Sequence, residues 1–299
     1  MHSIKKDYEQ QEQTQFQHPF QYQPPNTQRD YYPSFSSTDS DSEQNEVEEN
    51  VFQAGGHGGI FRDEKGKIRK KTTKQEIKFY RSLELNRDIP EPIKKLCPQY
   101  YSYKKDNHKR MPRSSYYIYL QDLTDDMEKP CIMDIKMGTI TAGKDSNFVK
   151  KKVVIKKDKG TTSYETGMRI VGARIYNIES KSYRIIGRSE GYGITEHQLP
   201  AFISGYFYNG STFHSHLVSA FLLQLKVIAD WMEKQTTYRL YSSSILFVYD
   251  GMNPTKFDVR MIDFAHVIKS NDGKIDSGYF TGIKNLINCL EQFEDFSSE

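Results

Sequence analysis

The stretch Pro-Cys-Ile-Met-Asp-Ile-Lys-Met-Gly occupies residues 130–138. Its mostly apolar character predicts a β-strand over 131–137. Side chains alternate between the two faces of a strand, so Asp134 and Lys136 point the same way. One interpretation is an exposed salt-bridge face. The other is a binding site, because the glycine at position 138 lets a ligand approach the backbone closely.

Two further apolar strings lie downstream, SSSILFVYDG at 242–251 and VRMIDFAHV at 259–267. They predict short strands over 245–249 and 257–262, separated by a turn cluster. Asp263 ends the second strand, where a carboxylate could hold Mg²⁺ on nucleotide phosphates; the alternative is a turn or helix-capping residue. The serines at 242–244 could donate hydroxyl hydrogen bonds to phosphate, or form a solvated turn.

The remaining strong patterns predict strands and helices around these motifs. Apolar residues recur every three or four positions in 214–235 and again in 279–293, which predicts two amphipathic helices. Residues 73–86 predict a third helix, in which Thr73 and Glu76 have capping-box spacing. Strands are predicted over 67–71 and 116–120. The spacing of glycine and proline between the elements favours a mostly antiparallel sheet.

Charge divides the chain of 299 residues into two parts. Residues 1–50 contain three basic and ten acidic residues, which leaves 39 basic and 29 acidic residues in 51–299. The first segment has no Leu, Ala, Cys or Trp, so it cannot bury enough apolar surface to offset its ordering entropy. We therefore expect a disordered acidic, Gln-rich tail at 1–50 and a basic folded domain over 51–299.

A lysine-rich stretch at 144–159 is the most concentrated cationic segment of that domain. We favour a helix there, although 153–155 would also suit a strand. The segment could be a solvated charged face or a site for a polyanion. Aromatic residues do not interleave with its lysines, and no RNA- or DNA-binding motif occurs, so DNA or RNA is not expected; a compact phosphorylated metabolite is the other candidate polyanion.

Several protein classes are disfavoured by composition. Mean hydropathy is −0.75, and no apolar run reaches the roughly 18 residues that a membrane-spanning helix needs. The first residues lack the apolar core of a secretory signal. The three cysteines are scattered, which is typical of reduced thiols in a cytoplasmic or nuclear protein. We therefore expect no membrane association. We also expect a monomer.

Taken together, the motifs resemble those of the inositol polyphosphate kinases. The family signature Pro-x-x-x-Asp-x-Lys-x-Gly is met by residues 130–138, a Ser-Ser-aliphatic-Leu string by 243–246, and an Ile-Asp-Phe string by 262–264. The chain looks most like the inositol hexakisphosphate kinase branch. The resemblance implies an α+β, two-lobed, protein-kinase-like fold with antiparallel sheets and a lysine-rich substrate-binding segment. The N-lobe would span about 51–123 and the C-lobe about 124–299.

The resemblance also implies a role for individual residues. Lys70 would neutralise ATP phosphates, unless the register of the Arg-Lys-Lys string is off by one, and Glu76 would be its partner. Gln121 and Leu123 would belong to the hinge whose backbone reads adenine. Asp134 would contact the ribose, and Lys136 would lie between the substrate hydroxyl and the γ-phosphate. The implied catalytic residues are Lys136, Asp134 and Asp263; the cofactor-binding residues are Lys70, Glu76, Gln121, Leu123, Asp134, Ser243 and Asp263, with Asp263 also the Mg²⁺ ligand.

The implied function is ATP- and Mg²⁺-dependent phosphorylation of an inositol phosphate, with the hexakisphosphate favoured as the acceptor and a diphosphoinositol pentakisphosphate as the product. Such a substrate carries a charge of about −9 to −12. The expected substrate-binding residues are Lys136, Lys150, Lys151, Lys152, Lys156, Lys157, Lys159 and Arg188. One alternative is a multikinase acting on inositol tris- and tetrakisphosphates. Another is a polyanion-binding module without catalytic activity.

Overall fold

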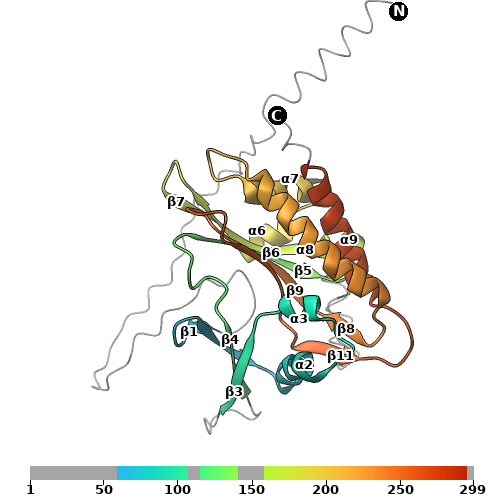
Figure 1. Ribbon diagram of the computed structural model, residues 1–299. Coiled ribbons are helices and arrows are strands. Elements are labelled where there is room, and N and C mark those ends of the chain that lie inside the picture. Colours follow the sequence, from blue (N-terminus) through green and yellow to red (C-terminus); the bar gives the residue numbers. More distant parts are fainter. Residues whose placement is uncertain (1–58, 107–114, 141–157, 295–299) are drawn as a thin grey trace, which may run out of the picture. The chain divides into compact units, whose positions relative to one another are not determined.

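The structure is a computed structural model that describes residues 59–106, 115–140 and 158–294. These residues belong to one compact unit, Glu48–Glu299. Their strands form sheets of four, five and two strands (Figure 1). Among the described strands every pairing is antiparallel, as the sequence predicts.

The four-stranded sheet uses strands that precede the predicted hinge. Its order is β1-β2-β4-β3. The strands, with the two helices that lie between them in the sequence, are β1 (Ile60–Arg62), β2 (Lys67–Thr72), α2 (Lys74–Leu85), α3 (Glu91–Lys95), β3 (Tyr100–Asp106) and β4 (Ser115–Gln121). Strand β2 pairs Lys70 with Ile118 of β4, so the register of the Arg-Lys-Lys string is fixed in the middle of the sheet.

Helix α2 begins where the sequence predicts. The Thr73 side chain accepts a hydrogen bond from the Glu76 amide at 3.3 Å and so caps the helix. Ile77, Tyr80 and Leu83 share one face of the helix and are all buried. The Glu76 side chain, in contrast, points away from the cap and forms an ion pair with Lys70.

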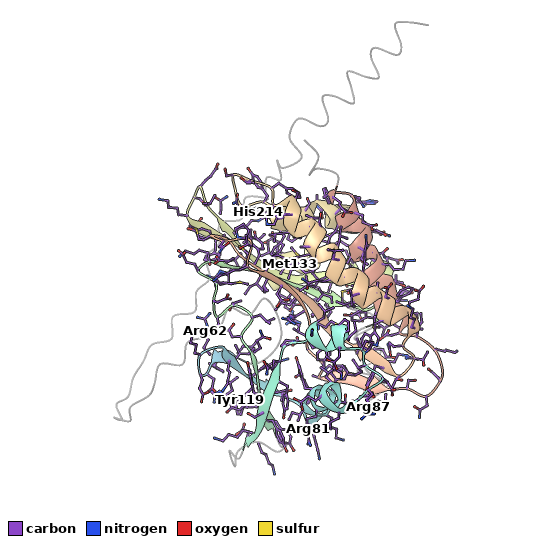
Figure 2. The ribbon with its side chains drawn as sticks, in the orientation of Figure 1. Arg62, Arg81, Arg87, Tyr119, Met133 and His214 are labelled. Carbon is purple, nitrogen blue, oxygen red and sulfur yellow. The ribbon has the colours of Figure 1, made fainter. Side chains whose placement is uncertain are left out.

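The five-stranded sheet holds the opening motif at its centre, in the order β10-β9-β5-β6-β7. Its strands are β5 (Pro130–Met137), β6 (Met168–Asn177), β7 (Ser182–Ile186), β9 (Ser244–Asp250) and β10 (Phe257–Ile262). The fully buried side chains of Met133 and Ile135 in β5 lie opposite Phe247 and Ile245 in β9. Figure 2 labels Met133, which joins the main hydrophobic core.

Two long helices cover one face of this sheet. Helices α8 (Ser215–Lys234) and α9 (Ser277–Glu291) lie side by side in Figure 1, with α8 against β10 and α9 against β5 and β6. Phe221 of α8 packs edge-on against Phe247, with 4.7 Å between ring centroids. Burial of several large apolar side chains, each worth about 1.5–3 kcal/mol, therefore holds the sheet to the helices.

Shorter elements connect these parts. They are α5 (Ser163–Thr166), α6 (Arg188–Gly193), η1 (Glu196–Gln198), α7 (Leu199–Ser204), η2 (Gly205–Phe207), β8 (Tyr238–Tyr241) and β11 (His266–Lys269). Strands β8 and β11 form the two-stranded sheet. Gly167 follows α5 at a φ of 71°, and a side chain there would collide with the backbone of Gly282 in α9. This contact requires glycine at both positions.

The structure confirms most of the predicted elements. The helices predicted over 73–86, 214–235 and 279–293 are α2, α8 and α9, and the predicted strands are β2, β4, β5, β9 and β10. The helix favoured over 144–159 lies almost entirely outside the described residues.

Two expectations from the composition, reduced cysteines and no membrane-spanning helix, can also be compared with the structure. All three cysteines are buried and free. Among the described residues, no helix combines the length and the apolar character needed to cross a membrane.

Tyr206 contacts both β5 and β9, so it offers a test of how much this contact stabilises the sheet. Its buried hydroxyl lies 3.0 Å from the carbonyl oxygens of both Cys131 and Phe247, which share its one proton as acceptors. We expect Tyr206→Phe to lower the free energy of unfolding by about 1–2 kcal/mol, because buried carbonyl groups lose a donor. Urea denaturation checks this value. Tyr119→Phe, on the partly exposed outer sheet (Figure 2), is the control, and equal effects of the two changes would contradict the assignment.

Candidate active site

Strand β5 presents Asp134 and Lys136 on the face opposite the helix-packed core. Asp134 is only 6% exposed, so the interpretation as an exposed salt-bridge face was wrong. Lys136 donates a hydrogen bond to the Ser242 carbonyl at 3.0 Å. Ser242 has a φ of 59°, a strained conformation that turns this carbonyl toward the lysine. The motif therefore fixes a buried acid and a tethered amine on one strand.

A second cluster joins the four-stranded sheet to the strand that carries Asp263. Lys70 Nζ lies 2.9 Å from Glu76 Oε1 and 2.5 Å from Asp263 Oδ1. Glu76 is fully buried and also accepts hydrogen bonds from the Thr72 hydroxyl and from the Phe264 amide. Glu76 thus serves as the partner of Lys70 rather than as a capping-box residue. Lys70 is also the residue of the Arg-Lys-Lys string that faces this cluster.

The two clusters form one electrostatic unit. Burial raises the pKa of Asp134 to about 6; the charge of Asp263 adds to this rise, while Lys136 and Arg169 oppose it. Burial would also raise the pKa of Asp263, but the charge and hydrogen bond of Lys70 outweigh it and hold that pKa below its usual range. Asp134 and Asp263 therefore differ in proton affinity although they share one site.

The pKa values of the two lysines shift in opposite directions. Burial lowers the pKa of Lys136 despite the charges of Asp134 and Asp263. Burial would also lower the pKa of Lys70, but Asp263 and Glu76 outweigh it and raise that pKa above its usual value. Lys70 is therefore firmly cationic, whereas Lys136 is the more readily deprotonated of the two.

Arg169 of β6 extends the site beyond Lys136, with which it is paired in register. Its guanidinium group donates to the Ser163 hydroxyl at 2.8 Å and lies 3.4 Å from Asp158. It also lies over the ring of Tyr192, 5.2 Å from the centroid. Arg169 is 6% exposed. Because three neighbours hold this buried arginine, it is a cation in a fixed position beside β5.

The expected substrate-binding residues are only partly within the described chain. Arg188 begins α6, is exposed, and lies 5.6 Å from the Tyr192 centroid, so Tyr192 contacts both arginines. Lys159 is exposed and follows Asp158, the partner of Arg169. The others, Lys150, Lys151, Lys152, Lys156 and Lys157, lie outside the described residues.

The predicted hinge is a tightly bonded turn. The Gln121 amide donates to the Gln99 carbonyl and the Asp122 amide to the Gly66 carbonyl, each at 2.9 Å. Asp122 is buried and pairs at 3.0 Å with Arg62, which Figure 2 labels and which ends β1 of the four-stranded sheet. Among the described residues, the Leu123 amide has no hydrogen-bond acceptor. Leu123 is therefore the hinge residue whose backbone can bind a ligand.

Ser243 was wrongly included among the cofactor-binding residues. Its side chain is fully buried, and its hydroxyl donates to the Leu240 carbonyl at 2.8 Å. Its own carbonyl accepts from the Met137 amide at 3.0 Å. The hydroxyl stabilises the turn after β8, where the strained neighbour Ser242 reverses the chain, and it has no free donor for a phosphate.

Sequence reasoning missed Arg169 and Tyr192. The signal for Arg169 was a charge within the apolar run of residues 168–176, since a charged side chain inside a strand pattern is buried only when it is paired. Tyr192 lies in the short helix α6 and has no comparable signal in its spacing.

The carboxylates fit a divalent cation brought by a ligand better than a resident metal. No group of three or more metal-ligating side chains occurs among the described residues. Asp134 Oδ1 is buried and accepts no hydrogen bond from a described residue, and the charge of Asp263 acts on the same carboxyl group. Mg²⁺ commonly takes one or two carboxylates and completes its coordination with phosphate oxygens and water. Asp263 and Asp134 therefore suit a metal–nucleotide complex.

The raised pKa of Asp134 predicts a pH-dependent stability. Its pKa is about 6 in the folded state against 3.8 for the unperturbed group. Its contribution is therefore present below pH 4 and lost as pH rises through 6. Relative to Asp134→Asn, the metal-free protein should lose up to about 3 kcal/mol of unfolding free energy between pH 4 and 7. Urea titrations with a chelator check this, and a constant difference between the two proteins would contradict it.

Comparison with known proteins agrees with the geometry of the site. Residues 117–291 match the inositol polyphosphate kinase family. Inositol hexakisphosphate kinase 3 from Mus musculus is 30% identical over 227 residues, which cover 68% of this chain and 55% of the relative. Inositol hexakisphosphate kinase 2 from Oryctolagus cuniculus is 27% identical and covers 76% and 64%. The chain thus spans about half to two thirds of the length of these relatives.

Two solved structures share the fold. An inositol phosphate multikinase is 29% identical, with a TM-score of 0.62, over 73% of this chain and 98% of the other. The inositol phosphate multikinase from S. cerevisiae in complex with ADP and Mn²⁺ is 23% identical, with a TM-score of 0.65, over 76% and 98%. The expected α+β kinase-like fold is thereby confirmed. With its signature strand, its Lys70 cluster and this match over more than half its length, the chain belongs to the inositol polyphosphate kinase family.

Proposed function

We propose that this protein is an ATP-dependent inositol phosphate kinase whose favoured acceptor is inositol hexakisphosphate. The observation that carries the proposal is the placement of Lys70 between Glu76 and Asp263, on the same site as Asp134 and Lys136. Phosphoryl transfer needs positioning and charge neutralisation more than covalent chemistry by the protein. A fixed cation, two carboxylates and a tethered amine supply those needs.

The nucleotide would lie between the hinge and the two carboxylates. The Leu123 amide is available to adenine, Lys70 to the phosphates, and Asp263 with Asp134 to Mg²⁺. Bound MgATP supplies the γ-phosphoryl group and the positive charge that neutralises it. The multikinase that binds ADP and Mn²⁺ has this fold, which supports nucleotide and divalent-cation binding here.

We assign Asp134 to the phosphate end of the site rather than to the ribose. The charges that act on it most strongly are those of Asp263, Lys136 and Arg169, none of which belongs to the hinge. With a pKa of about 6, Asp134 can accept a proton near neutral pH. Lys136, held by the Ser242 carbonyl, is placed to orient the acceptor group and to offset developing negative charge.

The positive charge near Lys136 and the names of the relatives both favour inositol hexakisphosphate as the phosphoryl acceptor. Arg169 and Arg188 are joined through Tyr192 next to Lys136, which places several cations where an inositol phosphate would bind. A phosphate acceptor is already ionised near neutral pH, so the site needs no strong base for it. The curated relatives act on the hexakisphosphate according to their names.

A multikinase acting on inositol tris- and tetrakisphosphates is the second candidate, because the 29% identical solved structure is a multikinase. A polyanion-binding module without catalytic activity is the third. It would use the same cations, but it would not need the carboxylates that surround Lys70.

One incubation separates these functions. The protein is mixed with MgATP and a panel of inositol phosphates, and the products are resolved by charge. We expect the hexakisphosphate to yield a more highly charged product. Asp263→Asn and Lys136→Ala should each lower turnover by about 10²-fold or more, since each removes charge stabilisation in the transition state.

Asp126→Asn is the matched control, because Asp126 forms an exposed ion pair with Lys256 and, among the described residues, shares no ion pair with Lys70, Asp134, Lys136 or Asp263. Product from the trisphosphate alone would favour the multikinase. No product, with unchanged polyanion binding by Asp263→Asn, would leave only the binding module.

Arg169→Lys tests whether the fixed Arg169 guanidinium group binds the inositol phosphate. Lysine keeps the charge but loses the planar donors that Ser163 and Tyr192 now engage. We expect the KM for the inositol phosphate to rise about tenfold, while the KM for ATP stays the same. Steady-state kinetics with each substrate varied provide the measurement. Arg184→Lys, in an exposed pair with Glu190, is the control; a change in the ATP KM alone would refute the assignment.

A further inference from the structure

A pocket outside the candidate active site, with a volume of about 460 Å³, lies between α2, the end of α3 with the chain that follows it, the end of β4, and Arg260 of β10. None of Lys70, Asp134 and Asp263 lines it. Among the predicted nucleotide-binding residues of the described chain, only Gln121 reaches this pocket. A volume of this size suits a small organic ligand.

The floor of this pocket is apolar and the rim is charged. Tyr80, Leu83 and Cys97 form the floor, and each is at most 5% exposed. Three cations stand on the rim, Lys94, Lys95 and Arg260, against one carboxylate, Glu84. This combination fits a flat apolar body that carries one negative group.

The cations differ in how strongly they are already engaged. Arg260 is held by Asp258 at 2.6 Å in a half-buried pair. Lys94 pairs with Glu91, which is 73% exposed, and such pairs contribute little and exchange readily. Lys95 forms no ion pair within the described chain. Lys95 and Lys94 are therefore the cations available to a ligand.

The pocket is connected to the active site through α2. Tyr80 lies one helical turn after Glu76 and stacks with Tyr100 on the rim, with centroids 6.1 Å apart. The same ring packs edge-on against Phe264 at 5.4 Å. Phe264 in turn donates its amide to Glu76 at 3.1 Å and follows Asp263. A ligand that fixes Tyr80 would therefore act on both partners of Lys70.

We propose that this pocket is a second ligand site, which takes a compact aromatic anion and is coupled through α2 to the nucleotide site. The claim that a ligand binds here depends on the pocket alone. The coupling half rests on the proposed function, because it requires that the Lys70 cluster binds a nucleotide. Coupling is reciprocal, so each ligand changes the affinity of the other by the same factor.

The probe is 1-anilinonaphthalene-8-sulfonate, a flat aromatic dye with one sulfonate whose fluorescence rises in apolar sites. It is titrated into the full chain in the presence of saturating MgATP. We expect one bound dye per chain. Gln99→Trp, on the exposed rim, should abolish binding by filling the pocket, and Lys95→Glu should weaken it about fivefold, the size expected for one partly exposed charge.

Lys78→Glu is the matched control, because Lys78 is exposed on α2 but does not line the pocket. Equal dye binding by wild type, Gln99→Trp and Lys95→Glu would overturn the site. Calorimetry then measures MgATP affinity with and without the dye. A change of at least about threefold supports coupling, and none refutes it. If MgATP does not bind at all, the proposed nucleotide function fails, while the dye result still decides the pocket.

Discussion

The arrangement depends on one partly buried ammonium group, that of Lys70. Lys70 comes from the four-stranded sheet, Glu76 from α2, and Asp263 from the end of β10 in the five-stranded sheet. Lys70 and Asp263 are 193 residues apart in sequence. Removing one partner would leave an uncompensated buried charge, which is far more costly than an unformed surface pair. The cluster thus ties the two sheets to one geometry.

Neighbouring contacts follow the same seam. The Thr73 hydroxyl donates to the Ala265 carbonyl at 3.4 Å, and the Gln75 amide group donates to the Val267 carbonyl. The ring of Phe79 packs against that of Phe264, with 4.3 Å between the ring centroids. Asp263 has a φ of 65°, and such strain persists only where surrounding contacts enforce it. The first turns of α2 and the chain after β10 therefore hold Asp263 in place, and the strain itself marks a functional position.

The sequence predicted elements whose period was strong and residues whose motif was specific. Strand β5 and helix α8 were clear because their apolar positions repeat, and Lys136 and Asp263 were clear because they sit at fixed places in strings. Burial of Asp134 and of Ser243 was not predictable, since both depend on how β9 and the turn before it pack on β5. Arg169 was missed for a related reason: its role arises from register with Lys136, which a single strand does not reveal.

Charge at the centre of the site constrains how a polyanion can be recognised. Lys70, Lys136 and Arg169 face Glu76, Asp134 and Asp263, so the formal charges of this central group cancel. Asp158 further neutralises Arg169. The centre therefore orients phosphates without attracting them from a distance. Under the proposed function, long-range attraction comes from exposed cations such as Arg188 and Lys159, in a domain with ten more basic than acidic residues. Because exposed charges are screened within about 8–10 Å at physiological salt, capture and chemistry are governed by different residues, and salt should weaken the first far more than the second.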